Sequence, residues 1–167
     1  MSEDRKVAII TGSSQGLGAS IAIKLSQRNI NLVINYSNSK DMALKIKDEC
    51  INNGVEAIIV QADVSNDDDC KKLVNETINI FGKVDILVNN AGTTKFADHS
   101  KLDKLSDEDF INIYKVNVIG PYQMIRAVEP IMKKNGFGSV VNISSIAGKT
   151  GIGSSMLMLL LKELLTQ

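Results

Sequence analysis

Short apolar runs rich in Val and Ile recur along the chain and predict a set of buried strands. These runs cover residues 7–10, 32–34, 55–60, 84–88 and 140–143. They are largely continuous and do not alternate strictly with polar residues, which is typical of parallel strands covered by helices on both faces. Stretches of helical length, with apolar residues at three- and four-residue spacing, lie between them at 19–28, 40–51, 67–81 and 122–134. This alternation predicts an α/β fold with a doubly wound parallel sheet of the Rossmann type, in three layers.

Two acidic clusters indicate where helices begin. Asp67, Asp68 and Asp69 open the third helical stretch, where carboxylates favour the positive end of the helix dipole. A similar cluster at 107–109 follows Ser106, and serine is a residue type that caps helix N-termini, so a further helix is predicted to begin there. We interpret this second cluster as part of the protein surface.

Composition limits the classes of function. The 167 residues suffice for one domain, and 19 Lys and Arg balance 19 Asp and Glu, so the chain has no basic field to hold a nucleic acid. Cys50, Cys70 and the single His99 form neither a disulfide framework nor a set of zinc ligands, which predicts no metal site and a reducing compartment. No apolar run has the length of a signal-peptide core or a membrane helix. We therefore expect a cytoplasmic protein that does not associate with membranes.

A glycine-rich loop between the first predicted strand and the first predicted helix is the strongest candidate for chemistry. It reads TGSSQGLG over residues 11–18. Glycines at such a junction let backbone N–H groups approach a phosphate at the helix N-terminus. A plain turn is the alternative interpretation, but the place between strand and helix favours phosphate binding, and the absence of Gly-Lys-Ser/Thr excludes a Walker loop. The candidate cofactor-binding residues here are Thr11, Gly12, Ser14, Gln15, Gly16, Leu17 and Gly18.

Four further motifs follow this loop along the chain. They are DV at 63–64, NNAG at 89–92, KVNV at 115–118 and VNISS at 141–145. Each of them alone also fits a turn, a helix cap or a loop. Together with T-G-x-x-x-G-x-G, and over about 6–162, they resemble the short-chain dehydrogenase/reductase family, because several motifs in the right order are hard to obtain by coincidence.

The resemblance implies roles for two of these motifs in cofactor binding. Asp63 and Val64 would contact the adenine ring of the cofactor. The NNAG motif would support the sheet and line the cofactor through Asn90, Ala91 and Gly92. The implied cofactor is a nicotinamide dinucleotide.

The segment after the second strand bears on the choice between NAD and NADP. An acidic residue there would hold the ribose 2′-hydroxyl of NAD and repel the extra phosphate of NADP. This chain reads NYSNSK over 35–40, without an acid, which favours NADP and leaves NAD open. Tyr36 and Ser37 are the candidate cofactor contacts, and Lys40 is a further candidate for the 2′-phosphate. Gln15 weakens this reading, since its loop position is often basic in NADP-preferring relatives.

The resemblance also implies a catalytic set. In the family a Ser polarises the substrate carbonyl, a Tyr donates a proton as hydride arrives, a Lys lowers the pKa of that Tyr, and an Asn anchors the Lys through a water. The family spacing assigns these roles to Ser145, Lys162 and Asn117, and it places Met158 at the Tyr position. A thioether has no proton to donate, and losing a general acid typically costs about 100- to 10,000-fold in rate. We therefore expect impaired catalysis.

The last residues depart from the family pattern. Residues 156–161 are all apolar and give no amphipathic helix face, although relatives continue through the catalytic helix and further strands. We hypothesise that a single-base deletion after Met156 has shifted the reading frame, which sequencing the coding DNA there tests. We expect 1–155 to form the dinucleotide-binding domain and 156–167 an altered remnant of the catalytic helix. A chain truncated before the last strands of the sheet is expected to have low stability.

The resemblance thus implies an oxidoreductase lineage. Its chemistry is NAD(P)H-dependent reduction of a ketone to a secondary alcohol, or the reverse, on a small-molecule substrate. NYSNSK and VNISSIAGKTG are similar to bacterial 3-oxoacyl thioester reductases of the acyl-carrier-protein and acetoacetyl-CoA types, which implies fatty acid metabolism. Family members tend to form homo-oligomers, and this chain is expected to lack much of that interface. A nucleotide-binding pseudoenzyme and an inert product of a decayed gene are the alternatives.

Overall fold

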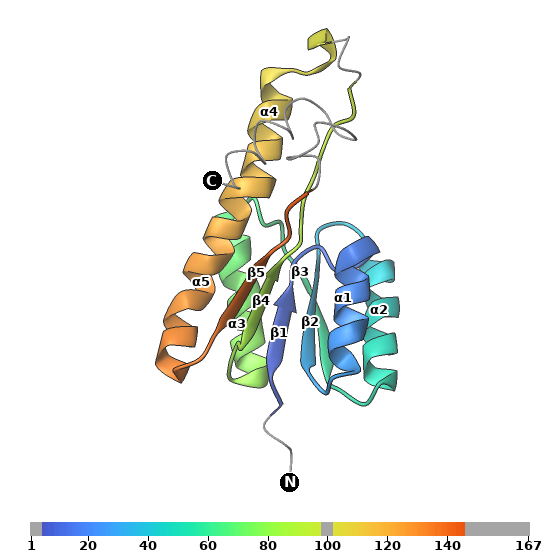
Figure 1. Cartoon of the computed structure of the whole chain (residues 1–167), viewed down its shortest axis with the longest axis vertical. Coiled ribbons are helices and arrows are strands. Elements are labelled where there is room, and N and C mark those ends of the chain that lie inside the picture. The colour runs from blue at the N-terminus through green and yellow to red at the C-terminus, as the bar shows by residue number, and fades with distance from the viewer. Residues whose placement is uncertain (1–4, 98–101, 146–167) are drawn as a thin grey trace.

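The computed structural model describes residues 5–97 and 102–145, and a parallel sheet forms its centre. Five strands pair in the order β3-β2-β1-β4-β5 (Figure 1). Their bounds are β1 Val7–Ile10, β2 Asn31–Tyr36, β3 Ala57–Gln61, β4 Ile86–Asn89 and β5 Ser139–Asn142. The strand order reverses at β1, which confirms the predicted doubly wound sheet of the Rossmann type.

Helices cover both faces of this sheet and complete the three layers (Figure 1). They are α1 Gly16–Ser26, α2 Lys40–Asn52, α3 Asp67–Phe81, α4 Asp107–Tyr114 and α5 Gly120–Asn135, with the 3-10 helix η1 Leu102–Lys104 and the π-helix η2 Lys115–Ile119. α1 and α2 pack on one face, while α3 and α5 pack on the other. In Figure 1, α4 extends beyond the carboxyl ends of the strands. No helix in the described ranges is long and apolar enough to span a membrane.

The central strand divides its side chains between two hydrophobic cores. Val7 and Ile9 of β1 belong to the core that α3 and α5 cover, whereas Ala8 and Ile10 belong to the core that α1 and α2 cover. All four side chains are at most 1% exposed. Successive side chains of a strand point to opposite faces, so a strand buried on both faces needs an apolar residue at every position. This explains the continuous run 7–10.

Capping residues explain why α3 has its predicted bounds. The Asn66 side chain accepts hydrogen bonds from two backbone N–H groups of the first turn, at 2.9 and 3.2 Å. At the other end Gly82 has a left-handed φ of 74°, a conformation that favours glycine and ends the helix. The predicted helix start after Ser106 is also confirmed, because Ser106 and Asp109 form a capping box at the start of α4.

Several expectations from the apolar pattern need correction. The pattern predicts burial on both faces for the last strand, but Val140 and Val141 are 41% and 44% exposed because β5 is an edge strand among the described residues. β2 extends beyond 32–34 at both ends, into polar residues, and β3 and β4 begin two residues after the predicted 55 and 84. α1 begins at Gly16, before the predicted residue 19, because the glycine-rich loop supplies its first turn and glycine is a poor sequence signal for a helix.

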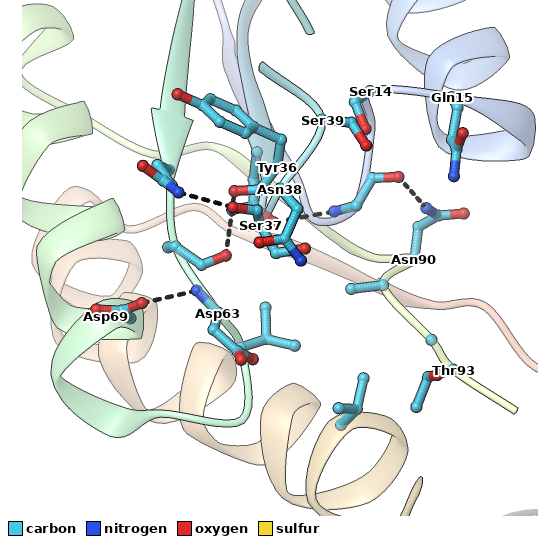
Figure 2. A pocket seen from close by; sticks show the side chains of 18 of the residues that line it. Ser14, Gln15, Tyr36, Ser37, Asn38, Ser39, Asp63, Asp69, Asn90 and Thr93 are labelled. Atoms are coloured by element: carbon cyan, nitrogen blue, oxygen red, sulfur yellow. Dashed lines mark hydrogen bonds between the residues drawn. The ribbon is translucent and has the colours of Figure 1, made fainter. Parts of the chain in front are cut away.

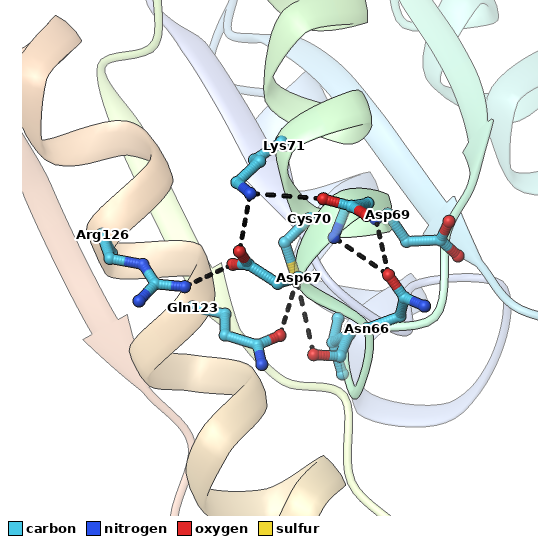
Figure 3. A network of polar contacts seen from close by, with 9 residues as sticks. Asn66, Asp67, Asp69, Cys70, Lys71, Gln123 and Arg126 are labelled. Atoms are coloured by element: carbon cyan, nitrogen blue, oxygen red, sulfur yellow. Dashed lines mark hydrogen bonds and ion pairs between the residues drawn. The ribbon is translucent and has the colours of Figure 1, made fainter.

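A polar network joins α3 to α5 (Figure 3). The Asp67 carboxylate accepts hydrogen bonds from Lys71, at 2.8 Å, and from Arg126 on α5, and these bonds lower the pKa of Asp67. The three side chains are largely or partly exposed, so their ion pairs add little stability. Cys70 is buried beside this network, with its Sγ 3.7 Å from Oε1 of Gln123.

We expect the cysteine thiols to be unreactive in the folded chain. Burial, followed by the nearby carboxylates of Asp67, Asp69 and Asp63, raises the pKa of Cys70 to about 12, and burial also raises the pKa of Cys50. The thiolate is the reactive form, so both thiols stay protonated at neutral pH. Ellman's reagent is expected to detect no thiol in the native chain and both in denaturant. Rapid labelling of the native chain at neutral pH would contradict this packing.

Candidate cofactor site

The glycine-rich loop turns sharply between β1 and α1. Gly12 has a φ of 60° and Gly16 a φ of 58°, in the left-handed region that favours glycine. Gly18 is required for a different reason. A Cβ there would lie 2.4 Å from Nδ2 of Asn90 and 2.7 Å from the carbonyl oxygen of Gly12. The loop can therefore pack this closely against the segment after β4 only because residue 18 has no side chain.

Side-chain hydrogen bonds join the same loop to the segment that follows β4. Oγ1 of Thr11 accepts hydrogen bonds from the backbone N–H groups of Asn90, at 3.0 Å, and Ala91, at 2.9 Å. In return, Nδ2 of Asn90 donates to the carbonyl oxygens of Thr11, at 2.9 Å, and Gly12, at 3.1 Å. Thr11 is buried, so water competes little for these bonds. TGSSQGLG and NNAG, far apart in the sequence, thus form one connected wall.

An open cleft of about 870 Å³ lies at the carboxyl ends of the strands (Figure 2). Its walls come mainly from the segments that follow β1, β2, β3 and β4, which is where doubly wound sheets bind ligands. Its volume is within the roughly 300–1,000 Å³ that is typical of ligand pockets. The predicted cofactor residues that line it are Gly12, Ser14, Gln15, Tyr36, Ser37, Asp63, Val64, Asn90, Ala91 and Gly92.

The remaining predicted loop residues do not line this cleft. Thr11 is buried and connects the walls, while Gly16 and Gly18 shape the backbone of the loop. The side chain of Leu17 is 56% exposed, and nothing in the structure explains the choice of leucine there. These residues therefore contribute through the backbone and the shape of the loop.

The N-terminus of α1 adjoins the cleft, because its N-cap residue Gln15 lines the wall. No side chain caps this helix, and its first turn carries no acidic residue. The backbone N–H groups of the first turn and the positive end of the helix dipole are thus available to an anion. This donor set and the nearby glycines fit the pyrophosphate of a dinucleotide.

Charged residues gather at the end of the cleft next to β3. The backbone N–H of Asp63 donates to Oδ2 of Asp69, at 2.8 Å. Lys72 on α3 lines the same wall, and its Nζ donates to the carbonyl oxygen of Gln61, at 3.4 Å. Within the described ranges Lys72 is the only Lys or Arg that lines the cleft, whereas Lys40, the candidate from the sequence, does not line it.

Sequence reasoning misses several residues of the cleft. These are Asn35, Asn38, Ser39, Gln61, Ala62, Asp69, Lys72, Thr93, Asn112 and Val116. For 35–39 a signal was available, because residues at the carboxyl end of a parallel strand lie at the ligand-binding edge. The sequence gives no such signal for the helix residues Asp69, Lys72 and Asn112, since only tertiary packing brings those helices to the cleft.

Asn117 lies in the π-helix η2 and holds the segment after β4. Its Oδ1 accepts a hydrogen bond from the backbone N–H of Thr93 and its Nδ2 donates to the Thr93 carbonyl, both at 2.8 Å. Asn117 is 6% exposed, and a Cβ on Gly92 would lie 3.3 Å from its Oδ1. π-helical turns are frequent at functional sites. The structure thus brings the predicted catalytic Asn beside a predicted cofactor residue.

The other predicted catalytic residues are only partly placed. Ser145 is half-buried and follows β5, which pairs in parallel with β4, so both segments leave the sheet at the same end. Met158 and Lys162 lie outside the described residues, and their roles stay predictions; His99, for which no role is predicted, lies outside them too. Within 5–97 and 102–145, no group of three or more His, Cys, Asp and Glu residues could hold a metal ion.

Comparisons with known proteins relate this geometry to a family. A family model described as short chain dehydrogenase matches residues 6–156. The 3-oxoacyl-(acyl-carrier-protein) reductase of Staphylococcus epidermidis is 36% identical over 146 residues, which are 87% of this chain and 59% of that protein. A reductase of the same name from Synechocystis sp. is 37% identical over 146 residues, 87% of this chain and 58% of that protein. The chain thus spans less than two thirds of the length of these curated relatives.

Solved structures share the fold. A crystal structure described as a short-chain dehydrogenase/reductase from Burkholderia xenovorans matches with a TM-score of 0.93 and 34% identity, over 98% of this chain and 69% of that chain. NAD⁺-bound xylitol dehydrogenase matches with a TM-score of 0.87 and 27% identity, over 96% of this chain and 60% of that chain. With a family match that covers most of its length, this chain belongs to the short-chain dehydrogenases, a family of NAD(P)-dependent oxidoreductases.

Proposed function

We propose that the cleft binds a nicotinamide dinucleotide, NADP in preference to NAD, and that the chain derives from reductases of 3-oxoacyl thioesters. The observation that carries this proposal is the close packing of Gly18 against Asn90, which joins the glycine-rich loop and NNAG into one wall of a cleft of about 870 Å³. The names of the curated relatives, 3-oxoacyl-(acyl-carrier-protein) reductases, support the substrate class.

The residues of the chain would bind and orient the reactants. When bound, the nicotinamide cofactor supplies the hydride that reduces a ketone to a secondary alcohol. The backbone N–H groups at the start of α1 would hold the pyrophosphate, and Asp63 would accept a hydrogen bond from the adenine amino group. Asn117 holds the Thr93 backbone at the cleft, and the Ser145 hydroxyl would donate a hydrogen bond to the substrate carbonyl.

We propose further that turnover by this chain is impaired. Met158 stands where the family has its proton-donating Tyr, and a thioether has no proton to donate. The cofactor cleft, in contrast, keeps its glycines and its hydrogen-bonded walls. The same combination favours a second candidate function, a nucleotide-binding pseudoenzyme that has kept the cleft and lost turnover.

Binding and turnover measurements separate these functions. Fluorescence titration of the full chain with NADPH is expected to show saturable binding. Loss of NADPH absorbance in the presence of acetoacetyl-CoA then measures turnover. Slow turnover supports the impaired reductase, and saturable binding without turnover supports the pseudoenzyme. Absence of binding by NADPH and by NADH would contradict both and favour an inert gene product.

Lys72→Gln is expected to raise the Kd for NADPH about fivefold and to leave the Kd for NADH unchanged. Lys72 Nζ contacts the carbonyl of Gln61, whose Nε2 donates to the carbonyl of Ser37 at 2.8 Å. The ammonium therefore lies close to the segment that would read the 2′-phosphate, the group that distinguishes the two cofactors. A charge at such an exposed site is worth about 1 kcal/mol. Parallel titrations with NADPH and NADH measure the difference.

Lys71→Gln is the matched control for this substitution. Lys71 is the neighbour of Lys72 on α3, but it pairs with Asp67 at 2.8 Å and does not line the cleft. Its loss is expected to change neither Kd. If Lys72→Gln binds NADPH as tightly as Lys71→Gln does, Lys72 has no part in the choice of cofactor.

A further inference from the structure

A buried asparagine at the end of β2 connects two walls of the cleft. Asn35 is 2% exposed, and its Oδ1 accepts a hydrogen bond from the backbone N–H of Gly12 at 3.0 Å. Its Nδ2 donates to the carbonyl oxygens of Ala62, at 3.0 Å, and Val60, at 3.3 Å. One side-chain amide therefore bonds the glycine-rich loop after β1 to the end of β3, across the strand between them.

Hydrogen bonds to the backbone of residue 35 hold the loop independently of this amide. The N–H of Ser13 donates to the Asn35 carbonyl at 2.9 Å, and the N–H of Asn35 donates to Oγ of Ser13 at 3.1 Å. Both bonds remain available when the side chain at residue 35 is changed. A substitution there consequently isolates what the amide adds, which is the placement of Gly12 relative to Ala62.

We infer that Asn35 is a positioning residue for cofactor binding, an inference that rests on the proposed function. Gly12 belongs to the proposed pyrophosphate loop, and Ala62 directly precedes Asp63 on the proposed adenine side. A dinucleotide must contact both segments at once, so the separation between them decides whether both sets of contacts form together. The Asn35 amide is hydrogen-bonded to the backbone of both segments, so it fixes the distance between the pyrophosphate loop and the adenine side.

The chain offers a matched comparison on the same strand. Asn31 lies at the opposite end of β2, is 7% exposed, and accepts a hydrogen bond at its Oδ1 from the backbone N–H of Glu56 at 3.0 Å. It is thus also a buried asparagine bonded to a neighbouring segment, but it does not line the cleft. Asn31→Asp keeps this acceptor, whereas Asn35→Asp loses a donor. A buried carboxylate at either position is expected to lower the stability of the sheet, and only loss of the Asn35 donor is expected to weaken nucleotide binding.

The test compares Asn35→Asp with Asn31→Asp in the full chain, at a temperature where both are folded. The probes are NADPH and ADP, because ADP spans the two walls without the nicotinamide. Asn35→Asp is expected to raise the Kd of both probes about tenfold, since a carboxylate cannot donate to the Ala62 carbonyl. Lowering the pH protonates the introduced carboxyl and restores a donor. The affinity of Asn35→Asp for both probes, relative to that of the unmodified chain, is therefore expected to recover. Asn31→Asp is expected to match the unmodified chain at each pH.

Two results would overturn the inference: unchanged affinity in Asn35→Asp, or an equal loss of affinity in Asn31→Asp, which would mark a general effect of a weaker sheet. If Asn35→Asp does not fold, Asn35→Ser replaces it. The short serine side chain cannot make both hydrogen bonds and leaves room for water, so the same loss of affinity is expected. This variant has no pH-dependent recovery. A different result, failure of the unmodified chain to bind NADPH, NADH or ADP, would contradict the proposed function itself and the inference with it.

Discussion

Gly18→Val is expected to raise the Kd for NADPH by about 100-fold or more. A Cβ at this position would lie 2.4 Å from Nδ2 of Asn90 and 2.7 Å from the carbonyl oxygen of Gly12. The second contact is with backbone, which cannot rotate away as a side chain can, so the loop must separate from NNAG. We expect the displaced loop to lose two of the backbone N–H hydrogen bonds proposed for the pyrophosphate, and at about 1.5–3 kcal/mol each their loss accounts for an effect of this size. Fluorescence titration with NADPH measures it.

Gly16→Ala serves as the control within the same loop. Gly16 has a φ of 58°, and a Cβ there would meet no atom within 4 Å. This substitution adds only backbone strain of about 1 kcal/mol, so we expect the Kd for NADPH to stay within about fivefold. Thermal unfolding shows whether both variants are folded. Equal NADPH affinity in the two variants would mean that the Gly18 contact does not shape the binding site.

Asn117→Leu is expected to lower the free energy of unfolding by about 2–4 kcal/mol. Leucine has the same number and branching of side-chain heavy atoms as asparagine, but it leaves the backbone N–H and C=O of Thr93 without their two hydrogen bonds of 2.8 Å. For a chain of this size each kcal/mol corresponds to roughly 2–4 °C, so Tm is expected to fall by about 5–15 °C. Circular dichroism during heating measures the change.

Asn135→Leu controls for the chemical change in this experiment. Asn135 is exposed at the end of α5, where substitutions usually change stability by less than about 0.5 kcal/mol. Asn117→Leu is therefore expected to unfold well below Asn135→Leu. Coincident unfolding curves would show that the segment after β4 does not depend on Asn117.

Much of the fold could be predicted where apolar runs and caps determine it. β1 and α3 have the predicted bounds, because 7–10 is buried on both faces and the caps Asn66 and Gly82 delimit α3. The apolar pattern underestimates the length of β2, since this strand contains the polar residues Asn31 and Asn35. In a sequence, polar residues of this kind are typical of loops. Only the folded structure shows that their side chains form hydrogen bonds to the backbone of neighbouring segments.

The candidate site could be predicted where its residues follow strands. The motifs after β1, β3 and β4 meet in the cleft because parallel strands end at a common edge of the sheet. Lys72 could not be predicted, since the packing of α3 brings it to the cleft. Only the family resemblance predicts that Asn117 belongs to the site. Its bonds to Thr93 depend on a π-helix, which a period of 3.6 residues does not indicate.

The two edges of β1 differ greatly in the sequence separation of their partners. Ala8 pairs with Leu32 on one side and with Ile86 on the other. Closing the longer loop costs more chain entropy, so β4 is expected to join the sheet after β1, β2 and β3 have paired. The contact between Gly18 and Asn90 then forms late on the folding pathway. A nucleotide that needs this contact would stabilise the assembled sheet without accelerating its assembly.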